Sequence, residues 1–236
     1  MLANGVLVAQ VENDSESFVV GLAKGTGGKI WKINRPKSAN WTTATVHKSK
    51  SGKERVFLQS GQGIHDIDPN SGKIIWHYSD GASTIPSSAL LGNMLYVPSQ
   101  GLTALELSKD GKSFEQKWRS SRLRPGTASP LAYRNHIYSL NNAGVLACAD
   151  IDSGKRLWQL RLDGPFGGSP VVADNHLYVF SEEGLAQVVD LTAPEGAISG
   201  KMDLGEMIQC SPALANGALY VRSNLRIWKI AKKTNF

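Results

Sequence analysis

The stretch Ser129–Trp158, SPLAYRNHIYSLNNAGVLACADIDSGKRLW, decides the fold. Two extended runs flank the tight turn Arg134-Asn135, where Asn tolerates the positive φ that such a turn requires. A polar loop, a third extended run at Val145–Ala149 and a second turn at Asp150–Gly154 then lead to the closing tryptophan. The stretch therefore predicts four short antiparallel strands.

The rest of the chain consists of imperfect copies of this unit. The tight turn recurs at Gly92-Asn93, at Asp174-Asn175 and at Asn216-Gly217. The closing turn also recurs, and it places Trp31, Trp76, Trp118 and Trp158 at separations of 45, 42 and 40 residues. Such a period with four strands per repeat is typical of propeller blades, whereas helical repeats show a 3.6-residue period.

We therefore predict an all-β fold, a β-propeller of four-stranded antiparallel blades. Residues 1–236 are expected to form a single domain with about five blades and a partial one. The fifth blade has no tryptophan in its closing segment, Gly196–Met202. The approximate blade ranges are 1–31, 40–76, 86–118, 127–158, 167–202 and 209–230.

The four repeated tryptophans are predicted to join neighbouring blades. A lone four-stranded sheet exposes two faces and can bury them only against similar sheets. Burying one indole removes roughly 200 Å² from water, which is worth on the order of 5 kcal/mol. This structural role explains Trp31, Trp76, Trp118 and Trp158 without any ligand.

Charge and composition exclude several function classes. The net charge is +6, but the cations are scattered, and the densest group, Lys48 to Arg55, contains no interleaved aromatic residue. Nucleic-acid binding is therefore not expected. No run of 18 apolar residues predicts a transmembrane segment, and residues 1–20 lack the basic start of a secretory signal.

The two cysteines are predicted to be free thiols. Cys148 and Cys210 align with small residues that we place on inner strands, where a thiol packs like an alanine. They are more than one blade apart, so a mutual disulfide is not expected.

The closing turn resembles the PQQ-type propeller repeat, whose pattern is Ala-x-Asp-x-x-Thr-Gly-x-x-x-Trp. The match extends over nearly the whole chain, although the first blade has Ala23 in place of the acid and the third carries an insertion. The matching residues are Thr26, Gly27 and Trp31 in blade one; Asp66, Asp68, Ser71, Gly72 and Trp76 in blade two; Ala104 and Glu106 in blade three; and Cys148, Asp150, Ser153, Gly154 and Trp158 in blade four.

The resemblance implies relatives of two kinds, the quinoprotein alcohol dehydrogenases and the non-catalytic outer-membrane assembly lipoprotein of Gram-negative bacteria. Both are eight-bladed and exported, so the resemblance implies a periplasmic or other exported location. Against eight blades this chain is about two short, and its first and last units each lack part of a blade. We therefore expect a fragment or truncated form, an incomplete part of an eight-bladed ring.

No residue pattern predicts a catalytic, cofactor-binding or metal site. A quinoprotein site in this family has adjacent cysteines and calcium ligands from several strands, and no adjacent cysteine pair occurs here. Asp68 and Asp150 precede the turn glycines and are expected to cap backbone N–H groups. Of the histidines, His136 and His176 share one repeat position, and we assign His47, His65 and His77 to separate blades.

These observations favour a non-catalytic propeller that acts as a scaffold or protein-interaction module of the bacterial cell envelope. Its candidate contact surface comprises Arg122, Leu123, Arg124 and Phe166, in connections between blades. One alternative is a PQQ- and calcium-dependent dehydrogenase whose other parts lie outside this chain. Another is a carbohydrate- or envelope-binding propeller that uses Trp41 and Tyr133. The partner and the oligomeric state stay open.

Overall fold

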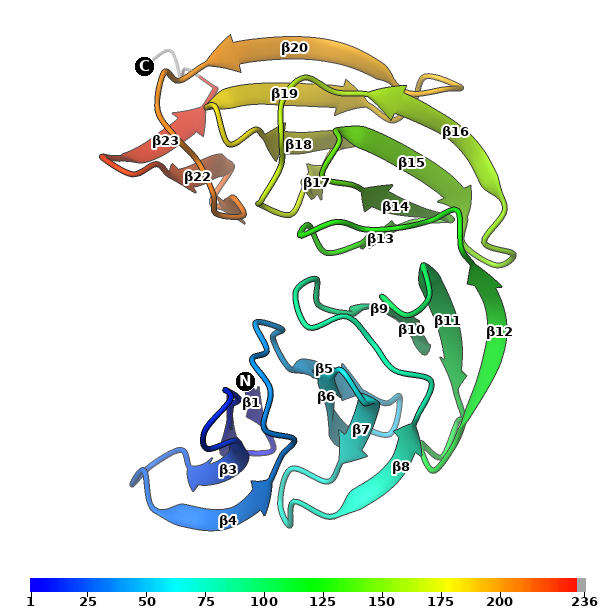
Figure 1. The fold of residues 1–236 in the computed structure, drawn as a ribbon, viewed down its shortest axis with the longest axis vertical. Helices are drawn as coiled ribbons and strands as arrows, with labels where there is room; N and C mark the ends of the chain where they lie inside the picture. The colour runs from blue at the N-terminus through cyan, green and yellow to red at the C-terminus, as the bar shows by residue number, and fades with distance from the viewer. Residues whose placement is uncertain (233–236) are drawn as a thin grey trace. The chain divides into compact units, whose positions relative to one another are not determined.

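The computed structural model describes residues 1–232 and consists of antiparallel β-sheets joined by turns and loops (Figure 1). The chain divides into two compact units, Met1–Ser121 and the residues from Arg122 onward. Within the described residues there are six sheets and no helix; five sheets have four strands and the last has three. The prediction of an all-β fold with four-stranded antiparallel blades and one partial blade is confirmed. A single domain over residues 1–236 stays a prediction.

The first unit contains three sheets, each a meander in which the strands follow chain order. Its strands are β1 (Leu2–Ala3), β2 (Val6–Val11), β3 (Phe18–Ala23) and β4 (Lys29–Asn34); β5 (Thr45–Lys48), β6 (Glu54–Ser60), β7 (Gly63–Ile67) and β8 (Ile74–Tyr78); and β9 (Ala89–Leu91), β10 (Met94–Val97), β11 (Leu102–Leu107) and β12 (Phe114–Ser120).

The second unit also contains three meanders, and the last of them ends with its third strand. Its strands are β13 (Leu131–Tyr133), β14 (His136–Leu140), β15 (Val145–Asp150) and β16 (Arg156–Arg161); β17 (Val171–Ala173), β18 (His176–Phe180), β19 (Leu185–Asp190) and β20 (Ala197–Asp203); and β21 (Ala213–Ala215), β22 (Ala218–Arg222) and β23 (Ile227–Ala231).

Tight turns connect the first and second strands of most sheets. Arg134, Asp174 and Asn216 have φ values of 53°, 47° and 49° at these turns. Positive φ matches the right-handed twist of the flanking strands, which is why two-residue hairpin turns adopt it. The predicted hairpins Arg134-Asn135, Asp174-Asn175 and Asn216-Gly217 all connect paired strands.

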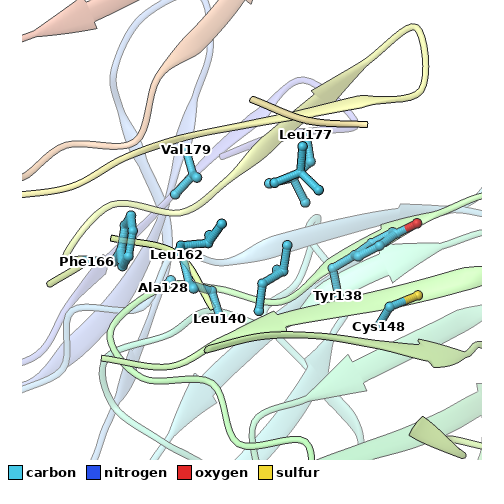
Figure 2. Packing of buried hydrophobic residues seen from close by; sticks show 10 residues of the cluster. Ala128, Tyr138, Leu140, Cys148, Leu162, Phe166, Leu177 and Val179 are labelled. Atoms are coloured by element: carbon cyan, nitrogen blue, oxygen red, sulfur yellow. The ribbon is translucent and has the colours of Figure 1, made fainter. Parts of the chain in front are cut away.

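The core of each unit lies between neighbouring sheets. In the first unit Val8 and Val56, from adjacent sheets, share one buried cluster. In the second unit Tyr138 and Leu140 of β14 pack in one cluster with Leu177 and Val179 of β18 (Figure 2). Within each unit, neighbouring sheets therefore bury their apolar faces against one another, as a lone sheet cannot.

The cysteines are both free, as predicted, but only one lies on an inner strand. Cys148 is buried in β15. Cys210 lies in the connection before β21, partly exposed, and its Sγ donates to the carbonyl oxygen of Arg222 at 3.2 Å. Its placement on a strand was wrong, because β21 begins only after Pro212 and the connection keeps Cys210 outside the sheet.

The described residues include no helix that is long and apolar enough to cross a lipid bilayer.

Replacing Trp158 by alanine is expected to lower the free energy of unfolding by about 3 kcal/mol, since the indole packs on the core cluster of the second unit. Urea denaturation followed by circular dichroism measures the loss. Trp41→Ala is the matched control, because Trp41 is 68% exposed and should cost below about 0.5 kcal/mol. A loss below about 1 kcal/mol at position 158 would contradict the predicted role of this tryptophan in holding sheets together.

Candidate functional site

One cross-strand row recurs in all five four-stranded sheets and sets the faces between them. In each sheet a β-bulge lies beside this row, between the third and fourth strands. A bulge inserts one residue and bends the strand, so it re-aims the next side chain. From second to fourth strand, the rows are Val8–Gly21–Trp31, Phe57–Asp66–Trp76, Tyr96–Ala104–Trp118, Tyr138–Cys148–Trp158 and Tyr178–Val188–Gly200.

The indole of Trp31 spans the gap to the next sheet. It covers Gly21 so closely that a Cβ there would lie 2.3 Å from the ring, and a Cβ at Gly72 of the following sheet would lie 2.7 Å from it. Its Nε1 donates to the carbonyl oxygen of Pro69 at 2.8 Å. In the second unit Trp158 approaches Gly196 in the same way, with a Cβ there 2.8 Å from the ring.

The other two repeat tryptophans are more deeply buried. Trp76 and Trp118 are each 9% exposed. Trp76 packs against Phe114 of the neighbouring sheet with ring centroids 4.8 Å apart, and Trp118 lies 5.9 Å from Tyr96 of its own sheet. Aromatic pairs at these separations add to the free energy gained by burial.

The repeat aspartates hold the closing turns. Asp68 Oδ1 accepts backbone hydrogen bonds from Asn70 and Ser71 at 2.8 and 3.2 Å. Asp150 Oδ1 accepts from the Ser153 hydroxyl at 2.5 Å and from its N–H at 2.9 Å, and these bonds lower the pKa of Asp150. The turn glycines Gly27, Gly72 and Gly154 have φ values of 70°, 71° and 67°. The carboxylates of Asp68 and Asp150 therefore stabilise the backbone of these turns.

Asp66 of the second row is engaged in a buried ion pair. Its carboxylate pairs with the guanidinium of Arg55, and both side chains are almost fully buried. Arg55 Nη1 also donates to the carbonyl oxygen of Gly111 in the next sheet at 2.8 Å. Burial raises the pKa of Asp66 to about 7, although Arg55 acts in the opposite direction. Through the hydrogen bond from Arg55 to Gly111, this ion pair joins two neighbouring sheets. The other rows carry uncharged residues at the position of Asp66.

A second buried polar cluster lies between the first two sheets. Arg35, just after β4, donates from Nε to Glu12 Oε1 at 2.6 Å, and these side chains are 2% and 1% exposed. Arg35 Nη1 also contacts His65 Nδ1 on β7. Asn40 Nδ2 donates to Glu12 Oε2 at 2.7 Å. Cavities of about 260 and 410 Å³ border this cluster.

The histidine assignment was wrong for three of the five residues. His47, His65 and His77 lie in one sheet, and His65 pairs across strands with His77, with ring centroids 4.1 Å apart. Because Arg35 can only donate, Nδ1 of His65 accepts and the proton of the neutral ring lies on Nε2. Burial, Arg35 and His77 lower the pKa of His65 to about 4. Such a histidine is a weak general base at pH 7.

The predicted contact surface is partly buried. Phe166 is 1% exposed and packs in the core cluster beside Leu162 (Figure 2). Its placement on an interaction surface was wrong, because the connection that carries it folds back into the core. Leu123 is also fully buried, whereas Arg122 and Arg124 are exposed on either side of it. Contact through these arginines stays a prediction.

The two candidate carbohydrate-stacking residues differ in exposure. Trp41 is 68% exposed. Tyr133 is half-buried; its hydroxyl donates to Asn175 Oδ1 at 3.2 Å, and the Arg134 guanidinium lies 5.3 Å from its ring centroid. The ring of Tyr133 is therefore already in contact with protein groups on one side.

The described residues do not fit a calcium site of the dehydrogenase kind. Calcium needs six to eight oxygens that converge from several strands. Within residues 1–232 no three acids, histidines or cysteines gather in a way that could hold a metal ion. The acids of the repeats are engaged in turns or ion pairs. Burial also raises the pKa of Cys148 to about 11, so its thiol is not activated.

The bulged row and the Asp-capped turn together define the chain as a β-propeller protein of PQQ-like repeats. The sequence profile of the family described as Outer membrane protein assembly factor BamB matches residues 15–132, 110–199 and 142–234. The chain belongs to this family. The resemblance predicted from the closing turns is thereby confirmed.

Solved structures share the fold at low sequence identity. BamB from Moraxella catarrhalis has a TM-score of 0.76 and 16% identity over 97% of this chain and 70% of its own. The computationally designed Ika8 protein has a TM-score of 0.59 and 13% identity, over 98% of this chain and 82% of its own. No curated protein matches the chain significantly.

Acidification from pH 6.5 to 4 is expected to destabilise the first unit through His65. In the unfolded chain His65 binds a proton at the ordinary histidine pKa, whereas in the folded chain it binds one only near pH 4. The free energy of unfolding therefore falls as the pH is lowered through this window. The loss is on the order of 1–2 kcal/mol, after allowance for solvent screening at a half-buried ring. Burial of the His65 ring, together with Arg35 and His77, sets this response.

Urea midpoints measured at pH 7 and pH 4.5 test the expectation. His65→Gln should lose less stability than the wild type between pH 7 and pH 4.5, because glutamine carries no titrating group, while the opposing contribution of Asp66 is the same in both proteins. His176→Gln makes the same chemical change in the second unit and is the matched control. Equal acid sensitivity in the wild type and in His65→Gln would contradict the assignment.

Proposed function

We propose that this chain is a non-catalytic propeller that acts as a scaffold or protein-binding module in the bacterial cell envelope. One observation carries the proposal: this chain matches the family of the outer membrane protein assembly factor. The three matched segments of the chain together run from residue 15 to residue 234. The proposed location is the periplasm, at the outer membrane. The proposed partner is a protein of the machinery that assembles outer membrane proteins.

The arrangement of the acidic side chains supports a non-catalytic role. Asp68 and Asp150 hold turns, and Glu12 and Asp66 are buried against arginines. A catalytic acid or base needs a free face toward substrate and a pKa matched to the working pH. Glu12 and Asp66 lack that free face, and Asp68 and Asp150 are occupied in holding turns, so we propose that the chain works without PQQ, calcium or another cofactor.

The exposed arginines between β12 and β13 supply a contact surface of defined chemistry. Leu123 is fully buried, whereas Arg122 and Arg124 on either side of it are exposed to solvent. Arginine is enriched in protein interfaces because its planar guanidinium pairs with two carboxylate oxygens at once. The surface therefore suits an acidic patch on a partner.

Reversing both charges, in Arg122→Glu with Arg124→Glu, is expected to weaken capture of the assembly partner at least tenfold. The capture uses tagged chain and detergent-solubilised outer membranes, with the partner identified by mass spectrometry. Lys50→Glu with Lys53→Glu is the matched control, since both lysines are exposed on a hairpin of the first unit. Undiminished capture by the arginine variant would remove this surface from the proposal, and absence of any assembly protein would contradict the proposed partner.

Titration of the purified chain with PQQ, with and without calcium, is expected to give no saturable quenching of tryptophan fluorescence. The reason is that the acids a calcium-bound quinone would need are held in turns and ion pairs. Calcium-dependent quenching at micromolar PQQ would contradict the non-catalytic proposal and favour a dehydrogenase.

A further inference from the structure

Gly200 occupies the place where the other four bulged rows carry tryptophan. It pairs with Val188 directly beside the bulge of its sheet, as Trp158 pairs with Cys148 in the preceding sheet. The row Tyr178–Val188–Gly200 thus lacks only the indole that completes the row Tyr138–Cys148–Trp158. The missing side chain belongs between the sheet β17–β20 and the sheet β21–β23.

A cavity of about 200 Å³ lies at this place. Its lining includes Tyr178, Val188 and Gly200 from one sheet and Leu219 and Ile230 from the next. Among residues 1–232, nothing would lie closer than 3.9 Å to a Cβ at Gly200, and the backbone there has no positive φ. In the first sheet an indole fills the corresponding space, since a Cβ at Gly21, the cross-strand partner of Trp31, would lie 2.3 Å from the ring.

Two polar side chains that line this cavity, Gln187 and Lys201, are already paired. Gln187 donates from Nε2 to the carbonyl oxygen of Asp163 at 2.9 Å and accepts the N–H of Asp163 at 3.0 Å. The ammonium group of Lys201 pairs with the Asp163 carboxylate. A charged ligand would find no unpaired counter-charge among these two, so the cavity selects an uncharged apolar one.

We propose that this cavity is a binding site for a small, uncharged, planar aromatic molecule of about the size of indole. An apolar cavity of about 150 Å³ suffices for benzene, so one of about 200 Å³ admits a larger ring. Tyr178 and Phe180 offer ring contacts, and Met202 offers a sulfur contact. A wider concavity shares Tyr178, Leu219 and Ile230 with this cavity.

Indole binding to the full chain tests the proposal, followed through the NMR methyl signals of Leu219 and Ile230. Saturable shifts are expected, with a dissociation constant on the order of 0.1–1 mM for a ligand of nine heavy atoms. Gly200→Trp should supply the missing ring from the chain itself. It is expected to raise the thermal unfolding midpoint and to weaken indole binding at least tenfold.

Gly25→Trp is the matched control, because Gly25 has open space around it in a turn of the first unit, and it should bind indole like the wild type. If Gly200→Trp fails to fold, Gly200→Leu fills part of the cavity and should weaken binding several-fold. Absence of saturable shifts, or unchanged affinity in the folded Gly200 variant, overturns the proposal. Equal binding of cyclohexylmethanol overturns the aromatic class. None of these results depends on the capture of an assembly partner.

Discussion

The structure depends on covering the faces of its small sheets, and in four of the repeats a tryptophan contributes to this. The β-bulge between the third and fourth strands directs the following side chain of the fourth strand toward the next sheet. The ring needs room on its own sheet, which is why Gly21 lies beneath Trp31. It also needs a partner opposite, which the turn at Pro69 and Gly72 supplies. The bulge, the tryptophan ring and the turn of the next repeat therefore act together in packing one sheet against the next.

In the first unit this apolar packing is supplemented by buried charge. Two ion pairs, Glu12–Arg35 and Arg55–Asp66, are almost completely shielded from water. The cost of removing such charges from water can equal their attraction, so buried ion pairs add little net stability but penalise every arrangement in which they separate. Each arginine also contacts a neighbouring sheet, at His65 or at Gly111. The pairs therefore favour one registration of sheet against sheet.

Local features were predictable from the sequence, and features made by distant residues were not. Turns such as Arg134-Asn135 and the Asp150 cap follow from short-range backbone chemistry. The meeting of Arg35 with His65 joins two sheets, and no local pattern encodes it. Phe166 was placed on the surface because its segment looks like a loop, yet the loop inserts its ring into the core. From the sequence, the missing tryptophan could be assigned only to the segment Gly196–Met202. Its exact position depends on the β-bulge, which shifts the pairing of β19 with β20.

The absence of an indole at Gly200 leaves a cavity because the strands around it are fixed by contacts at both ends. Phe180 and Val221 share a buried cluster that joins the two sheets at one end of their strands. At the other end, Gly196 at the start of β20 is fixed against the ring of Trp158. For the cavity to close, β20 would have to approach the next sheet and lose one of these contacts. A core that relaxes only partially around a missing side chain keeps a cavity. The space that tryptophan occupies in the other sheets therefore remains as a cavity beside Gly200.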